Sequence, residues 1–113
     1  MPRTIISVLV GISVLCTVAA QAQECRIVAV KNAKAGLVAH PGKLSEMLGL
    51  LRTPNVDDKT EAAICCLACM PRVGTKVLIT ERASTFYTVR VLEGPHRGCT
   101  GEIVIESVGE CPQ

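Results

Sequence analysis

Cysteines are the residues of this chain best suited to chemistry. Six of them follow residue 22 of the 113: Cys25, Cys65, Cys66, Cys69, Cys99 and Cys111. An even number of cysteines in a short exported chain indicates a disulfide framework, although six cysteines admit 15 pairings. The chain has one phenylalanine, one tyrosine and no tryptophan, so a core of this size is marginal without cross-links. We therefore expect the cysteines to be structural.

The first 22 residues predict export. Arg3 precedes an uncharged run from Ile5 to Val18, and Ala20-Gln21-Ala22 has the Ala-x-Ala form of a signal-peptide cleavage site. Cleavage after Ala22 would leave one 91-residue domain, residues 23–113, in a secreted or periplasmic location. A retained membrane anchor is the alternative, but the apolar run is shorter than the roughly 20 residues that cross a bilayer.

Net charge limits the class of partner. The formal charge is +2, and removal of Arg3 with the leader leaves +1. So small a charge argues against a nucleic acid or an anionic membrane as the partner.

Two helices and two short strands are expected in the first half of the domain. Residues 25–30 are apolar and β-branched, which predicts a strand, and residues 37–42 predict a second extended piece. A helix follows, because an apolar stripe at spacing i, i+3, i+4 and i+7 is formed by Leu44, Met47, Leu48 and Leu51.

The second helix is predicted to carry three of the cysteines. It spans residues 58–70, from the capping-box pair Asp58 and Glu61 to the residue before Pro71, with an apolar face of Ile64, Leu67 and Ala68. On such a helix, Cβ atoms three or four residues apart are roughly 5–6 Å from each other, which is too far for a disulfide, so we do not expect Cys65, Cys66 and Cys69 to pair with one another. We therefore expect each of them to pair with one of Cys25, Cys99 and Cys111, stapling the helix across the rest of the fold.

From residue 73 onward the apolar period becomes two, which predicts strands. Val77 and Ile79 alternate with polar or exposed positions, residues 88–93 continue the pattern, and Ile103 and Ile105 alternate with Glu102 and Glu106. The two glutamates are expected on a solvent-facing side of their strand.

The segment 73–107 resembles the small SH3-like barrels of exported bacterial proteins. Its stretch VRVLEGPHRGCTGEIV is similar to the KOW motif, with glycines at 94, 98 and 101. Such glycines serve a tight corner that needs positive φ or close backbone approach. The resemblance implies an α+β fold: a small SH3-like β-barrel in the C-terminal half, one or two helices before it, and disulfides holding the whole.

The resemblance does not carry over the usual ligands of such barrels. A groove for proline-rich peptides, or for stacked bases, needs several aromatic side chains, and the position after the last glycine is Glu102. We expect a module without enzymatic activity or cofactor, which binds another exported protein or a component of the cell envelope or serves as a rigid structural unit. The candidate contact residues lie in the loops 81–87 and 93–98: Phe86, Tyr87, His96 and Arg97.

A metal site or a thiol-redox site is the alternative function. Cys66-x-x-Cys69 and His96-x-x-Cys99 have the short spacings of a structural zinc site, and thiolate and imidazole suit zinc. The same Cys66-x-x-Cys69 pair resembles a redox motif, but it lies toward the C-terminal end of its predicted helix, where the helix dipole disfavours a thiolate. Free thiols would favour this alternative over the disulfide scaffold.

Overall fold

The computed structural model describes residues 22–112. The predicted signal peptide lies outside them except for its last residue, and its removal stays a prediction. The described part contains strands β1 (Gln23–Ile27), β2 (Val38–Ala39), β3 (Leu67–Cys69), β4 (Lys76–Arg82), β5 (Phe86–Val91), β6 (Thr100–Val104) and β7 (Val108–Gly109), helices α2 (Leu44–Leu51) and α3 (Val56–Cys65), and the 3-10 turn η1 (Ile105–Ser107).

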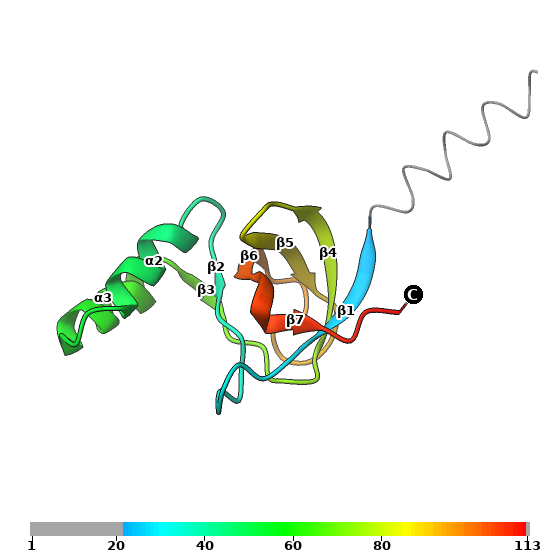
Figure 1. Cartoon of the computed structure of the whole chain (residues 1–113), viewed down its shortest axis with the longest axis horizontal. Helices are drawn as coiled ribbons and strands as arrows, with labels where there is room; N and C mark the ends of the chain where they lie inside the picture. Colours follow the sequence, from blue (N-terminus) through cyan, green and yellow to red (C-terminus); the bar gives the residue numbers. More distant parts are fainter. Residues whose placement is uncertain (1–21, 113) are drawn as a thin grey trace, which may run out of the picture.

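The strands form one antiparallel sheet that curls into a half-barrel (Figure 1). Their order across the sheet is β3-β2-β6-β5-β4-β1-β7. The prediction of an α+β fold with a curled sheet is confirmed. The sheet extends beyond the predicted core of residues 73–107, because β1 pairs with both β4 and β7, and β2 pairs with β6.

The period-two pattern of the sequence places the barrel core correctly. Val77, Ile79 and Ile103 are fully buried, as their alternation predicts. The prediction was wrong for Ile105, which is half-buried and begins the 3-10 turn η1, because the strand ends at Val104. The three buried residues pack with Cys25, Ile27, Val38, Cys69, Val89 and Val91 in the cluster inside the sheet. Apolar side chains on one face of each strand therefore define the inside of the curl.

The two helices lie between β2 and β3 in the chain and stand together beside that end of the sheet (Figure 1). The predicted stripe of α2 is confirmed, because Leu44 and Met47 are buried and Leu48 and Leu51 are half-buried. A second apolar cluster forms there from Ala39, Leu44, Met47, Ala62 and Cys66. Strand β2 joins the two clusters, since Val38 faces the barrel core and its neighbour Ala39 faces the helices.

Helix α3 differs from its prediction at both ends and in its buried face. It begins after Asn55, whose side chain accepts a hydrogen bond from the backbone N–H of Asp57, so the capping box at Asp58 was wrong. It ends at Cys65, because the next residues form strand β3 and pair with β2. Ile64 is 79% exposed, whereas Ala62 is 1% exposed and faces α2 and β2.

The glycine corner between β5 and β6 agrees with its prediction. Gly94 and Gly98 have φ of 81° and 92°. Gly101 allows close backbone approach instead, since a Cβ atom there would collide with the backbone oxygen of Ala39 in β2. The corner thus turns the chain and lets β2 approach β6 closely.

Candidate functional site

Strand β5 separates the four predicted contact residues. Phe86 begins the strand, whereas His96 and Arg97 lie in the loop after its end at Val91. Six residues of strand span roughly 17 Å, so the two loops lie at opposite ends. Phe86 and Tyr87 also face opposite sides: Phe86 packs with the helical cluster, and Tyr87 packs on the barrel core with the Arg82 guanidinium 5.0 Å from its ring centre.

Of the four predicted contact residues, Phe86 lines a groove between helix α2 and the sheet. On the outer face of the sheet it lies directly opposite Val104 in β6. Helix α2 stands next to this face and contributes Leu44 and Leu48. The space between helix and sheet is a groove of about 470 Å³, within the size range of ligand sites.

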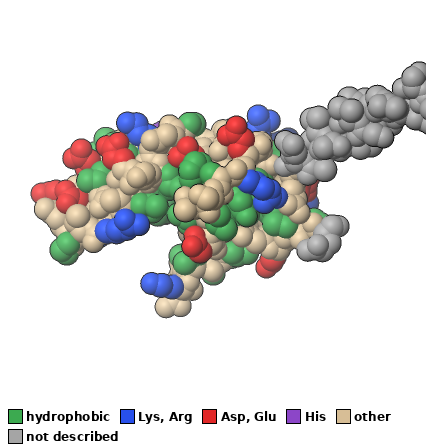
Figure 2. All heavy atoms as spheres, turned by 45° about the horizontal axis from the view of Figure 1, so that its top comes forward, with side chains coloured by type: hydrophobic (Ala, Val, Ile, Leu, Met, Phe, Trp, Pro, Cys, Tyr) green, Lys and Arg blue, Asp and Glu red, His purple; other side chains and the backbone are tan. Residues whose placement is uncertain are grey.

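Charged groups mark the groove as well as apolar ones. Arg52, the C-cap residue that follows α2, and Glu102 in β6 both line it. Within residues 22–112 no carboxylate lies within ion-pair distance of the Arg52 guanidinium. In space-filling view, hydrophobic side chains gather at the middle of one face, with charged side chains around them (Figure 2).

Glu102 has a structural task that its sequence pattern did not reveal. Its carboxylate accepts hydrogen bonds from the backbone N–H groups of Gly42, at 3.0 Å, and Leu44, at 3.4 Å. The residue before α2, Lys43, caps nothing with its own side chain. Glu102 therefore supplies from the sheet the negative charge and the acceptors that the start of a helix favours. The prediction that this side chain faces only solvent was wrong.

His96 lines a different cavity. This space of about 270 Å³ lies where the loop 93–98 meets the segment after β3, and Met70, Arg72 and Glu93 share it. His96 is half-buried there, and Arg97 is exposed. Their part in binding stays a prediction.

All six cysteines of residues 22–112 are in disulfides, but the predicted pairing is wrong for two of the three bonds. Cys69 pairs with Cys99, which is one of its three predicted partners. Cys25 pairs with Cys111, and Cys65 pairs with its own neighbour Cys66. The error follows from the helix boundary: because α3 ends at Cys65, the three cysteines are not held apart on one helix.

The same bonds separate the members of the proposed zinc set. Cys66 forms a disulfide with Cys65, while Cys69 and Cys99 are bonded to each other. His96 therefore has no free thiolate of that set beside it. The Cys66-x-x-Cys69 redox pair is likewise divided between two disulfides.

Sequence reasoning missed Leu48, Arg52 and Val104 as residues of the groove. It also missed Glu46, whose carboxylate lies within 4.8 Å of the sulfur atoms of Cys65 and Cys66. The helical stripe indicated that Leu48 is partly buried, but nothing local showed that α2 lies against β5 and β6. For Glu46 the local signal was no more than its ordinary spacing to Lys43, with which it forms an ion pair at 3.5 Å. Tertiary contacts decide the role of all four.

Comparisons of the chain with protein-family models, with curated proteins and with solved structures gave no significant match. Three disulfides are consistent with an oxidising compartment. Within residues 22–112, neither helix is long and apolar enough to span a membrane.

Proposed function

We propose that this chain is an exported, non-enzymatic binding module of SH3-like type, secreted or periplasmic after cleavage at Ala22. The curled antiparallel sheet, its glycine corner and its two long-range disulfides support this. A small domain that is cross-linked in this way can present a binding surface without depending on a large core.

The groove between α2 and the β5–β6 face carries the proposal. Its apolar wall, formed by Leu48, Phe86 and Val104, suits an aliphatic side chain, and Arg52 suits a carboxylate beside it. The ligand is therefore a segment of an exported partner protein with an aliphatic residue next to an acidic one. One aromatic side chain in the groove does not build the platform that a polyproline helix requires.

Expected affinity follows from the two contacts. Burial of one leucine and one charge-assisted hydrogen bond contribute together roughly 3–6 kcal/mol. The lost freedom of the peptide offsets part of this gain, so we expect a Kd of about 1 mM or weaker, which NMR titration can measure.

The test uses three capped peptides: acetyl-Ala-Leu-Asp-amide, its Asn counterpart, and acetyl-Ala-Ser-Asp-amide. We expect the first to shift the backbone signals of Leu48, Phe86 and Val104, and the other two to bind at least about fivefold more weakly, because each lacks one contact. Arg52→Gln should abolish the preference for Asp over Asn. The matched control, Arg90→Gln on the exposed side of β5, should keep it.

Two results would overturn the proposal. One is a set of shifts confined to another surface, such as the cavity around His96. The other is equal binding of the Asp and Asn peptides to the wild-type chain.

A further inference from the structure

The Cys65–Cys66 disulfide differs from the other two in what it can do for the fold. It joins neighbouring residues, whereas the partners of the other bonds are 86 and 30 residues apart in sequence. A disulfide stabilises mainly by restricting the unfolded chain, and a bond between neighbouring residues closes only a small ring with no residue between them. This bond is therefore not a staple of the fold, and its opening leaves the two long-range bonds in place.

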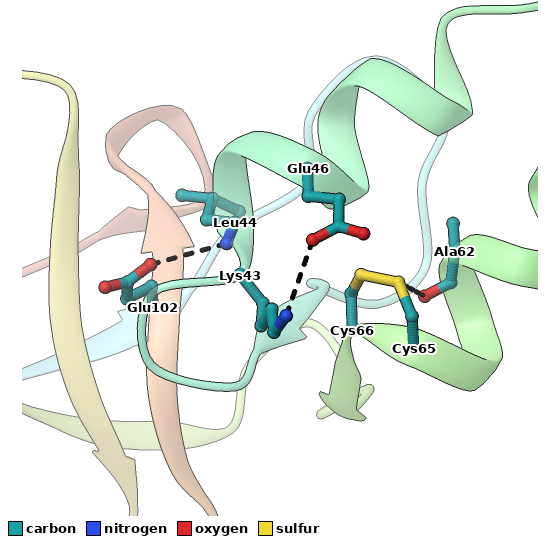
Figure 3. Close-up of a disulfide and its surroundings, with 7 residues drawn as sticks. All are labelled: Lys43, Leu44, Glu46, Ala62, Cys65, Cys66 and Glu102. Atoms are coloured by element: carbon teal, nitrogen blue, oxygen red, sulfur yellow. Dashed lines mark hydrogen bonds and ion pairs between the residues drawn. A yellow bond between two sulfur atoms is a disulfide. The ribbon is translucent and has the colours of Figure 1, made fainter.

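The position of the pair is well defined. Cys65 is the last residue of α3, and Cys66 follows it as the C-cap, buried against α2 and β2. Glu46 of α2 reaches the same corner (Figure 3). Its carboxylate and the two sulfur atoms all lie within 4.8 Å of one another.

These three groups form a ligand set for a soft divalent metal. Two thiolates select zinc or cadmium over magnesium or calcium, and zinc commonly accepts three protein ligands with water in the fourth position. Tetrahedral coordination at Zn–S distances of about 2.3 Å separates two sulfurs by about 3.8 Å. That separation requires an open disulfide, so the oxidised pair cannot serve as the site.

The charges around the corner also balance. Two thiolates, one carboxylate and a divalent cation sum to one negative charge. Lys43, whose ammonium group lies 3.5 Å from the Glu46 carboxylate, offsets it. The side chain of Glu46 is 52% exposed, so it can adjust to the metal.

We propose that reduction of the Cys65–Cys66 bond by a dithiol converts this corner into a zinc-binding site formed by Cys65, Cys66 and Glu46. A thiolate of the reductant attacks the Cys65 sulfur, the Cys65–Cys66 bond breaks, and Cys66 leaves as a thiolate. The second thiol of the reductant then displaces Cys65 from the mixed disulfide and closes a cyclic disulfide. The protein gains two electrons and two protons, and one zinc ion then replaces the two thiol protons.

Access to the pair supports attack at Cys65 rather than at Cys66. Cys65 is half-buried and lines a cavity of about 250 Å³ on the α3 side, whereas Cys66 is fully buried. Asp57 and Glu61 line the same cavity. Because these carboxylates repel anions, a neutral dithiol should open the bond faster than the anionic thiol glutathione does.

The experiment reduces the folded chain with limiting dithiothreitol and divides the product. One portion is alkylated, and its free thiols are mapped by mass spectrometry. The other portion is not alkylated and, once freed of reductant, is titrated with zinc against a chromophoric chelator. We expect alkylation at Cys65 and Cys66 alone, and one zinc ion per reduced chain. The oxidised chain and Cys65→Ser/Cys66→Ser should bind none at that site. Cadmium should give the thiolate-to-metal charge-transfer band with the reduced wild-type chain only.

A matched pair of variants tests the third ligand. Glu46→Gln should weaken zinc binding by at least about 10-fold. Substitution of a residue that only hydrogen-bonds to a metal ligand already lowers metal affinity by that factor, and Glu46 is itself a proposed ligand. Glu61→Gln, which removes an equal charge near Cys65, should leave the affinity unchanged. Earlier reduction of Cys25–Cys111 or Cys69–Cys99, equal zinc binding by the oxidised chain, or equal losses in the two glutamine variants would each overturn the proposal.

Discussion

Removal of the disulfides one at a time is the sharpest test of how this fold is held together. The three double variants are Cys25→Ala/Cys111→Ala, Cys69→Ala/Cys99→Ala and Cys65→Ala/Cys66→Ala. Each removes one buried and one half-buried cysteine. The loss of sulfur packing is therefore similar in all three, and differences between them report on the cross-link itself.

Chain entropy gives the expected order. Sequence separations of 86 and 30 residues correspond to losses in the free energy of unfolding of about 4.6 and about 3.6 kcal/mol at 25 °C. The Cys65–Cys66 bond, with a separation of 1, should contribute less than about 1 kcal/mol.

Thermal and urea unfolding of the oxidised proteins, followed by circular dichroism, measure these differences. In a domain of this size about 1 kcal/mol shifts Tm by roughly 4–8 °C, so loss of the Cys25–Cys111 bond should lower Tm by roughly 20–35 °C. The urea m-value should rise in the two long-range variants, because their unfolded chains expand, and should stay constant in the third. A loss of Tm in Cys65→Ala/Cys66→Ala as large as that in Cys25→Ala/Cys111→Ala would refute the reasoning.

Three further substitutions, two of them with a matched control, test these contacts by urea unfolding. Gly101→Ala should lower the free energy of unfolding by about 3 kcal/mol, because its Cβ would collide with β2. The control Gly49→Ala, in open space within α2, should raise it by roughly 0.5–1 kcal/mol. Equal effects would contradict the close approach of β2 at Gly101. Glu102→Ala should lower the free energy of unfolding by about 1–2 kcal/mol, because its hydrogen bonds to the start of α2 are lost. The control Glu106→Ala removes an exposed side chain and should cost less than about 0.5 kcal/mol. The reverse order would contradict the capping role of Glu102. Ile64→Ser should change stability by less than about 0.5 kcal/mol, and a loss of 2 kcal/mol or more would show that this side chain packs in the core after all.

The sequence allowed prediction of the features that depend on one segment at a time. Alternation placed Val77, Ile79 and Ile103 in the core, and the stripe of α2 showed which of its residues are buried, because each pattern needs only the period of its own element. The turn glycines Gly94 and Gly98 were equally local, since their spacing specifies a turn, whereas the role of Gly101 depends on the approach of β2. These features account for the sheet from β4 to β6 and for helix α2.

The remaining features depend on pairing between distant segments. Residues 66–70 read as a continuation of α3, but Leu67 and Cys69 pair with β2 and leave the helical conformation. Tertiary contacts override local helix preference there. The error at this boundary led to the wrong disulfide pairing and to the zinc set. The groove was missed for a different reason, since it depends on the packing of α2 against β5 and β6, which no single segment of the sequence shows.

Helix α2 links the two proposed sites. Leu44, Leu48 and Arg52 lie four residues apart on the side that faces the groove, whereas Glu46 points about 160° away from Leu48, toward the cysteine pair. A zinc ion that holds Glu46 to the end of α3 therefore restrains the same helix that forms one wall of the groove. If zinc changes the affinity for the Leu-Asp peptide, that peptide must change the affinity for zinc by the same factor, because linkage between binding sites is reciprocal. Measurement of both affinity changes therefore tests coupling through α2. If zinc acted from a second site that does not contact α2, the peptide would leave the zinc affinity of the Glu46 site unchanged.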